Sequence, residues 1–221
     1  MAYKYFGNPE FQNDFLNQGR IYFNSLSYFL TCEDKQRQDR TEHTNLYKPS
    51  DGLKVTTVNP QQTLIDERAL ISTVRRPDRI FVFCTSTEYS KALIERFNAS
   101  GCVEILDLTE FRKRLQTALD KKIRLGIVKN KTLLSGNIDY YDSESEPGAR
   151  HACPDKIIMS KPIQPFSIEK EYRFAFAKDK NAFDVNEINY YLAHQAPPYV
   201  GQNAHQTLEV GKLTDICRVL I

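Results

Sequence analysis

The most informative hydrophobic pattern is a period-two alternation in the stretch IEKEYRFAF, residues 168–176. Successive side chains of a β-strand point to opposite faces, so the alternation predicts a strand with two unlike faces. One face is largely apolar and carries Ile168, Lys170, Tyr172, Phe174 and Phe176. The other face begins with three charged residues, Glu169, Glu171 and Arg173. The alternation by itself favours an edge strand whose charges discourage aggregation over a strand that lines a site.

Short runs of β-forming residues predict further strands along the chain. The run RIFVFCTST, 79–87, is continuously apolar at its start, which is typical of a central strand. The other predicted strands cover 3–6, 20–23, 53–58, 102–106, 123–128, 137–142 and 188–193.

Helical periodicity appears in three segments: 9–19, 88–98 and 108–122. In the first, Pro9 suits the first turn and Gly19 supplies the C-terminal stop. In the last, Thr109 is the predicted N-cap. Polar segments without apolar periodicity predict surface loops, and these cover 31–45, 143–155 and 193–206.

Helices and strands therefore interleave, and neither a linker nor an internal repeat divides the chain. The sequence predicts a single α+β domain that spans 1–221. A composition of 41% apolar and 26% charged residues is that of an ordinary globular protein. The aromatic residues are all Tyr and Phe, which favours a sheet-rich core.

Charge and motif content exclude several classes of function. The net charge of +2 does not demand a nucleic-acid or membrane partner. The chain carries no glycine-rich phosphate loop, serine elbow or metalloprotease helix. The basic group Arg112, Lys113 and Arg114 is interpreted as the solvated face of the helix over 108–122. Cys84 lies within the predicted central strand and is interpreted as a small buried apolar residue.

Metal binding is not expected either. The five cysteines are scattered and never spaced as Cys-x-x-Cys, so neither a disulfide framework nor a structural zinc site is predicted. His151 and Cys153 are the only close His/Cys pair, and no second pair completes a four-ligand set. No signal-peptide pattern or membrane-length apolar run is present, so we expect a cytoplasmic protein without a membrane partner.

The charged face of the stretch 168–176 carries candidate chemistry. Alternation places the Glu169 and Glu171 Cβ atoms about 7 Å apart on one side of the strand. An ionised carboxylate there can polarise a hydroxyl or stabilise a cationic centre. Arg173, next along the same face, can orient a carboxylate or hold a phosphate.

Several stretches, in order, resemble a large bacterial family, domain-of-unknown-function family twenty-nine seventy-one. The resemblance runs from Tyr3 to about Ile188. Its stretches are YKYF, FLNQGRIYFNSLSYF, FVFCTSTE, VKNKTLLSGNIDYYD and FSIEKEYRFAF. The chain departs from many relatives after Phe29, where TCEDKQ replaces an Asn-Asp-Pro-Phe segment.

A more distant resemblance to ADP-ribosyltransferases supplies a reaction. It implies a split antiparallel β-sheet core with flanking helices, and NAD as the substrate. Lys4 lies where a basic residue on the first strand binds the nicotinamide ribose, although Arg or His is usual there. Tyr22 and Ser25 match the Tyr/Ser strand. The resemblance makes Glu171 the catalytic carboxylate, with Glu169 as its Glu-x-Glu companion.

A second mapping of the same resemblance stays open. In it the middle motif is Thr85, Ser86 and Thr87, and Arg20 replaces Lys4 as the basic residue. Either mapping implies an enzyme that transfers ADP-ribose from NAD to a macromolecule or hydrolyses NAD, as a toxin or phage-defence effector. In this reading the Glu/Glu/Arg face lines a cleft, and no metal is needed.

Two other classes of function are kept as alternatives. One is a nucleic-acid-binding or metal-dependent nucleic-acid-cleaving effector, in which the polar loop binds a divalent metal or phosphates. Its candidate groups are Glu33, Asp34, Arg37, Asp39, Arg40 and Glu42. The other is a non-catalytic module whose charged strand and long loop contact a partner protein.

Overall fold

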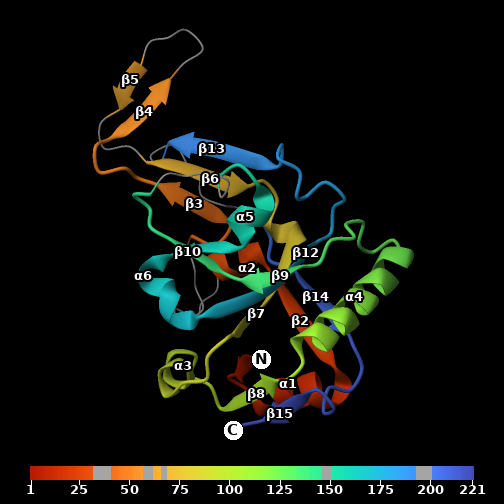
Figure 1. Ribbon diagram of the computed structural model, residues 1–221. Helices are drawn as coiled ribbons and strands as arrows, with labels where there is room; N and C mark the ends of the chain where they lie inside the picture. Colours follow the sequence, from red (N-terminus) through yellow and green to blue (C-terminus); the bar gives the residue numbers. More distant parts are fainter. Residues whose placement is uncertain (32–40, 57–61, 66–68, 146–150, 193–200) are drawn as a thin grey trace.

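The computed structural model describes residues 1–31, 41–56, 62–65, 69–145, 151–192 and 201–221. Figure 1 shows a mixed α+β architecture in which helices flank antiparallel sheets. The largest sheet has eight strands, with β14, β2, β7, β1, β8 and β15 in that order; β12 pairs with β7, and β9 pairs with β12. Its strands are β1 Ala2–Phe6, β2 Arg20–Ser25, β7 Ile80–Ser86, β8 Gly101–Ile105, β9 Leu134–Asn137, β12 Glu171–Ala177, β14 His205–Glu209 and β15 Cys217–Val219.

Strand β7 is the centre of this sheet, as its apolar sequence predicts. One edge of β7 pairs with β12 from Ile80 to Ser86. The opposite edge is divided between two strands: β2 pairs at Phe81 and Val82, and β1 pairs at Ser86. Within the described residues, no strand pairs with this edge at Cys84. The two halves of the sheet therefore separate along β7.

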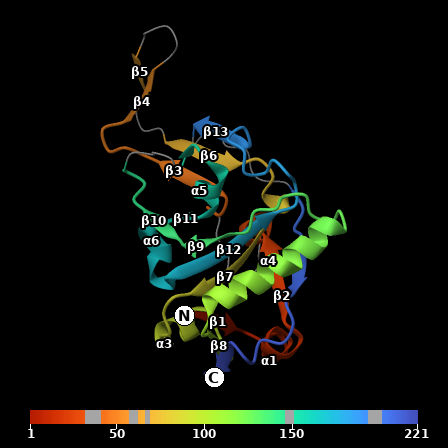
Figure 2. The same ribbon diagram turned by 45° about the vertical axis from the view of Figure 1, so that its right-hand side comes forward.

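Both faces of the β7–β12 pair are buried, which follows from their alternating side chains. One face sends Phe83, Phe174 and Phe176 into the larger apolar cluster, which also holds residues of α4. The other face sends Val82 and Ala175 into a second cluster with residues from β6, β13 and α5. Figure 2 shows α4 lying across the first of these faces. Strand β12 also pairs with β7 along one edge and with β9 along the other. It is therefore an interior strand, and the edge-strand interpretation of its charges is wrong.

Smaller sheets complete the fold. Strands β3 Thr44–Tyr47, β6 Leu70–Val74 and β13 Ile188–Leu192 form a three-stranded antiparallel sheet. The parallel pair is β10 Asp139–Tyr141 with β11 Ser160–Pro162. The hairpin is β4 Leu53–Thr56 with β5 Gln62–Ile65, and it projects from the rest of the chain in Figure 1.

The helical elements are short, apart from α4. They are α1 Pro9–Asn13, α2 Leu26–Thr31, α3 Lys91–Arg96, α4 Leu108–Arg124, α5 Pro154–Ile158 and α6 Ile163–Phe166. Single π or 3₁₀ turns cover Asp14–Gln18, Pro77–Arg79 and Ser167–Glu169. The predicted stop at Gly19 is confirmed: its φ of 61° is left-handed, where glycine is favoured. A Cβ there would lie 1.9 Å from the Gly211 carbonyl oxygen.

Helix α4 corrects two expectations. Its N-cap is Asp107 rather than Thr109, because the Asp107 side chain accepts a hydrogen bond from the Glu110 backbone N–H. The strand predicted over 123–128 is wrong. The helix continues to Arg124, and Gly126 ends it with a φ of 70°. Since Ile123 packs against the same apolar cluster as Leu119, the helical periodicity overrides the short run of β-forming residues.

Three loop predictions need adjustment. Within 31–45, residues 32–40 lie outside the described residues, and β3 already begins at Thr44. Within 143–155, residues 146–150 are likewise outside, and α5 begins at Pro154. Within 193–206, only 201–206 are described, and β14 begins at His205.

Candidate functional site

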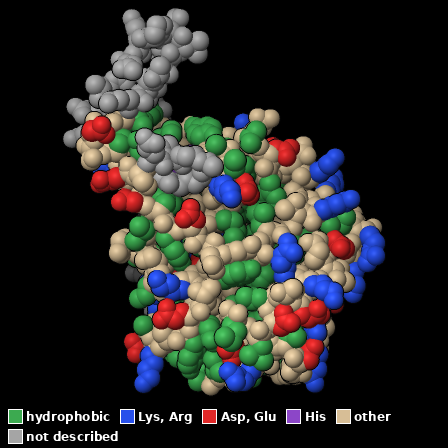
Figure 3. All heavy atoms as spheres, in the orientation of Figure 1, with side chains coloured by type: hydrophobic (Ala, Val, Ile, Leu, Met, Phe, Trp, Pro, Cys, Tyr) green, Lys and Arg blue, Asp and Glu red, His purple; other side chains and the backbone are tan. Residues whose placement is uncertain are grey.

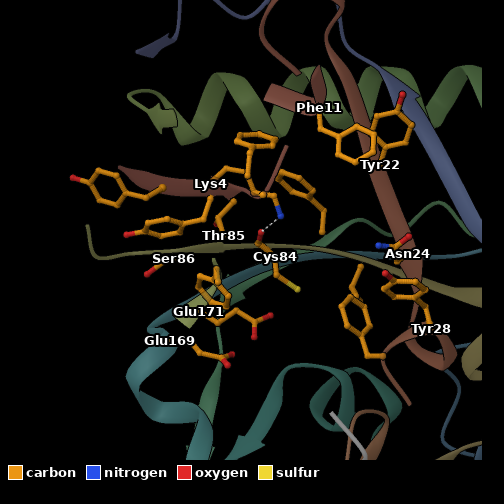
Figure 4. Close-up of a pocket in the computed structure, with 18 of the residues that line it drawn as sticks. Lys4, Phe11, Tyr22, Asn24, Tyr28, Cys84, Thr85, Ser86, Glu169 and Glu171 are labelled. Carbon is orange, nitrogen blue, oxygen red and sulfur yellow. Dashed lines mark hydrogen bonds between the residues drawn. The ribbon is translucent and has the colours of Figure 1, made fainter. Parts of the chain in front are cut away.

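A cavity of about 490 Å³ opens where β1 and β2 separate along β7. Residues of all three strands line it, together with α2, α6 and the start of β12. Figure 4 shows these side chains around a common space, with Phe11 and Tyr22 on one side and Glu169 and Glu171 on the other. This size lies within the range of pockets that hold small molecules.

Lys4 occupies the gap in the sheet. Its Nζ donates a hydrogen bond of 2.8 Å to the carbonyl oxygen of Cys84. The same ammonium lies 4.5 Å from the centroid of the Phe83 ring. The lysine side chain thus donates the hydrogen bond that a neighbouring strand would otherwise give to the Cys84 carbonyl. A buried carbonyl without a hydrogen bond costs free energy of folding. Lys4 therefore places a positive charge in the gap.

Much of the cavity wall is aromatic, and the rings differ in exposure. Phe15 and Phe83 belong to the buried core, and their stacked rings have centroids 6.1 Å apart. Phe11 is 55% exposed and Tyr22 is 37% exposed, and their centroids lie 6.0 Å apart. Partly exposed rings at the edge of a cavity offer a flat apolar surface to a planar ligand.

The opposite end of the cavity is an ion cluster, which we define as Glu42, Arg96, Lys161, Glu169, Glu171 and Arg173. Arg173 Nε donates to Glu171 Oε1 at 2.6 Å. Arg173 Nη1 donates to Glu42 Oε1, also at 2.6 Å, and to the Ile158 carbonyl at 2.6 Å. Lys161 Nζ lies 3.0 Å from Glu171 Oε2. Arg96 Nη2 lies 2.8 Å from Glu169 Oε1.

Three carboxylates and three cations balance in this cluster, although most of it is withdrawn from water. Glu171 is 4% exposed and Arg173 is 1% exposed. Burial alone would raise the pKa of Glu171, but the charges of Arg173 and Lys161 outweigh burial and hold that pKa well below its ordinary value. Glu171 is therefore a fixed anion at neutral pH. It can accept hydrogen bonds and stabilise positive charge, but it has no proton to donate.

Cys84 lies at the cavity wall beside Glu171. Burial, followed by the negative charge of Glu171, raises the pKa of the Cys84 thiol well above its ordinary value. The reactive form of cysteine is the thiolate, so this thiol is a poor nucleophile. Cys84 is half-buried at the cavity wall rather than fully buried as expected, and the anion that the cavity offers is the Glu171 carboxylate.

The structure brings together most of the residues that the resemblance to ADP-ribosyltransferases singles out. Those that line the cavity are Lys4, Arg20, Tyr22, Thr85, Ser86, Glu169 and Glu171. Thr87 is not among the lining residues. Arg173 lies directly behind Glu171 and is buried. Ser25 is also fully buried, away from the cavity lining. Its hydroxyl oxygen is 2.8 Å from that of Ser27 and accepts a hydrogen bond from the Ala204 backbone N–H.

Glu169 lies at the site because of a turn, and not because it belongs to the predicted strand. Residues Ser167–Glu169 form a 3₁₀ turn, and Lys170 has a φ of 46°, so β12 begins only at Glu171. The period-two argument is therefore wrong for Glu169, while Glu171 and Arg173 do share a strand face. Glu169 still faces the cavity because the turn brings its carboxylate to within 3.5 Å of Lys161 Nζ.

Sequence reasoning did not predict Lys161 or Arg96 as site residues, and it placed Glu42 in a surface loop. Lys161 precedes a proline in a short parallel strand, and Arg96 ends a small helix. No spacing links these positions to Glu171. The one usable signal is the charge on the interior strand β12, because buried carboxylates need cations from elsewhere in the chain.

The alternative metal site loses one of its candidate ligands. Glu42 is 4% exposed, and its carboxylate is paired with Arg173 and Lys161. The other residues proposed for that site, 33–40, lie outside the described residues. In the part of the chain that the structure describes, no group of three or more His, Cys, Asp or Glu side chains is arranged to hold a metal ion. Among the same residues, no helix has the length and apolar character needed to cross a membrane.

No protein-family model, no curated protein and no solved structure matches this chain. The resemblances to domain-of-unknown-function family twenty-nine seventy-one and to ADP-ribosyltransferases therefore stay predictions. What can be said about function rests on the cavity and on the ion cluster at its end.

Proposed function

We propose that the protein is an ADP-ribosyltransferase-like enzyme of split-sheet architecture that binds NAD in the cavity. The observation that carries the proposal is the position of Glu171. It is a carboxylate that is ionised at neutral pH and lies at one end of an aromatic-walled cavity, where two strands separate along β7. The proposed enzyme transfers ADP-ribose to a macromolecule or to water, as a toxin or phage-defence effector.

Glu171 suits the bond that this reaction breaks. The bond joins C1′ of the ribose to the nicotinamide nitrogen, and its electron pair leaves with the ring, which becomes neutral. Positive charge develops on the ribose, and a fixed anion stabilises that charge without reorganising. Each Glu171 oxygen keeps a lone pair beyond its ion pair, so the carboxylate can also accept a hydrogen bond from a ribose hydroxyl.

The acceptor supplies the new bond at C1′ and releases a proton. Both changes take place at its nucleophilic atom. Because Glu171 stays ionised beside Arg173 and Lys161, it is a weak base, and the proposal sends that proton to solvent. The acceptor is therefore a group that needs little activation, or water.

The rest of NAD matches the other end of the cavity. Arg20 lies near the cavity edge with 47% of its side chain exposed and 3.6 Å from Asp14, and we assign it to the diphosphate. Phe11 and Tyr22 provide the partly exposed rings on which an adenine base can stack. These roles for Arg20 and Tyr22 differ from those that the resemblance implies, in which Arg20 is the alternative to Lys4 at the nicotinamide ribose and Tyr22 belongs to the Tyr/Ser strand.

The test is a thermal-shift titration with NAD, followed by an assay of nicotinamide release, on the wild type and on Glu171→Gln. The matched control is Glu209→Gln, an exposed glutamate on β14. We expect NAD to raise the melting temperature of the wild type, because a ligand that binds only the folded state stabilises it. Glu171→Gln should release nicotinamide roughly 100-fold more slowly or worse, as expected when one preorganised group is removed. Turnover that survives this substitution would remove Glu171 from the mechanism.

A companion titration tests the two ends of the cavity separately. Phe11→Ala should weaken the binding of NAD, and it should leave the binding of nicotinamide mononucleotide, which has no adenine, nearly unchanged. Equal losses for the two ligands would contradict the assignment of Phe11 to the adenine. Isothermal titration calorimetry supplies both affinities.

A further inference from the structure

Lys161 is the one member of the ion cluster that contacts every carboxylate in it. Its Nζ lies 3.0 Å from Glu171 Oε2, 3.5 Å from Glu169 Oε2 and 3.6 Å from Glu42 Oε2. Arg173 pairs with Glu42 and Glu171, and Arg96 pairs with Glu169. The ammonium of Lys161 therefore joins the group of Arg173, Glu42 and Glu171 to the pair of Arg96 and Glu169.

The three carboxylates come from three segments. Glu42 precedes β3, Glu169 ends the 3₁₀ turn, and Glu171 begins β12. Lys161 itself lies in a fourth segment, β11, whose strand partner is β10. A point charge on a flexible stem can satisfy three carboxylates at once, whereas a planar guanidinium favours one or two.

Lys161 also differs from Arg173 in what it faces. Lys161 lines the cavity, and its Nζ lies 4.8 Å from the centroid of the Phe166 ring, another cavity residue. Arg173 is outside the lining and is tied to the backbone carbonyl of Ile158. Lys161 thus contacts the Glu171 carboxylate from the cavity, and Arg173 contacts it from the side away from the cavity.

We propose that Lys161 is a positioning residue that orients the Glu171 carboxylate toward the cavity and keeps it ionised. This inference rests on the proposed function, because it assigns Lys161 to the reaction that Glu171 supports. Lys161 itself does not attack the substrate. Burial would lower its pKa, but the three carboxylates outweigh burial and raise that pKa well above its ordinary value, so it stays an ammonium.

The groups that face Glu171 come from every element packed around it. Arg173 is on the same strand, and Lys161 contributes the second cation. The Tyr140 hydroxyl accepts a hydrogen bond from the Glu171 backbone N–H at 2.9 Å, and burial raises the pKa of Tyr140 to about 12. The remaining neighbours are the thiol of Cys84 and the carboxylates of Glu42 and Glu169. Removing Lys161 leaves Arg173 as the cation paired with Glu171.

The test is the pH profile of kcat for nicotinamide release by the wild type, Lys161→Met and Lys161→Arg. In the wild type kcat should stay level as pH falls until the protein unfolds. In Lys161→Met the pKa of the Glu171 carboxyl should rise by about one to three units, because the nearby cation no longer depresses it. The kcat of this variant should therefore fall at acid pH while the wild-type kcat is still level. Lys161→Arg, which keeps the charge, should restore the wild-type profile.

The matched control is Lys170→Met, an exposed lysine between the two glutamates, and its profile should match that of the wild type. If Lys161→Met does not fold, Lys161→Gln keeps polar contacts without the charge, and the same fall at acid pH is expected. A variant whose kcat falls by the same factor at every pH, with no additional fall at acid pH, has a merely structural defect and overturns the proposal.

A second readout separates this inference from the proposed function. The free energy of unfolding, measured by urea titration from neutral to acid pH, reports the Glu171 carboxyl without any NAD. Its acid decline should be smaller and should end at a higher pH in Lys161→Met than in the wild type, because loss of the Lys161 charge brings the folded pKa of Glu171 closer to its unfolded value. Lys161→Arg should restore the larger decline. Absence of NAD binding to the wild type would overturn the proposed function, while identical acid declines in all variants would overturn the role of Lys161.

Discussion

The two faces of strand β12 are both buried, yet they are built from opposite chemistry. One face packs Phe174 and Phe176 into the larger apolar cluster under α4. The other face presents Glu171 and Arg173 to the ion cluster. Apolar packing is non-directional and tolerates changes that preserve volume. A buried ion pair has no such tolerance, because each charge needs a partner at a fixed position.

This difference helps to locate the candidate site. Well-packed apolar residues often stabilise a protein as much as a buried ion pair does, so stability alone is a weak reason for such a cluster. Perturbed carboxyl groups beside a cavity are more typical of functional sites. Figure 3 shows the contrast with the outer surface, where Lys and Arg side chains lie along the side occupied by α4 in Figure 1. Those side chains meet water, whereas Arg173 meets carboxylates.

The largest expected effect comes from removing a cation from the ion cluster. Arg173→Leu leaves Glu42 and Glu171 short of a partner, and we expect a loss of about 3 to 5 kcal/mol in the free energy of unfolding. Urea titration at pH 7 provides the measurement. A variant as stable as the wild type would show that the charged face is no more demanding than the apolar face.

The pH dependence of stability gives the next largest effect. Arg173 and Lys161 hold the pKa of Glu171 below its unfolded value, so its contribution to stability is present above the unfolded pKa of about 4.3. That contribution is lost as pH falls toward the folded pKa. The difference in unfolding free energy between the wild type and Glu171→Gln should therefore be largest near neutral pH and should narrow below about pH 5. A constant difference over this range would contradict the assignment.

A volume-conserving change on the apolar face should have a smaller effect. Leu115 of α4 is fully buried in the same cluster as Phe174. Leu115→Met should cost less than about 1.5 kcal/mol. Its stability relative to the wild type should not vary with pH, since no titratable group changes. A pH-dependent difference would mean that the two faces of β12 are coupled.

The smallest effect is expected on the outer surface. The Lys113 side chain is 75% exposed, and it forms an ion pair with Glu110, three positions earlier on the same helix. Lys113→Gln should leave the urea midpoint unchanged within error, because exposed pairs contribute little. A clear loss of stability would contradict the interpretation of this basic group as a solvated helix face.

Several features of the fold follow from local sequence. The alternation in β12, the apolar run of β7 and the stop at Gly19 depend on neighbouring residues, so their patterns are visible in the chain itself. The same local reading failed where two signals competed. At 123–128 a strand was predicted, but the helix continues because Ile123 packs into the core. At Glu169 the strand alternation does not apply, because Lys170 has a left-handed backbone conformation and β12 begins only after it.

The sequence by itself determined which side chains of β12 share a face, because that depends only on the two-residue period of a strand. Only the tertiary structure decided that this face is buried and which cations complete it. Glu42 lies 131 positions from Arg173, and Arg96 lies 73 positions from Glu169. Contacts across such separations depend on how strands pair and helices pack, and no spacing in the chain encodes them. The charges of Glu171 and Arg173 were thus readable from the sequence, but their partners Lys161 and Glu42 were not.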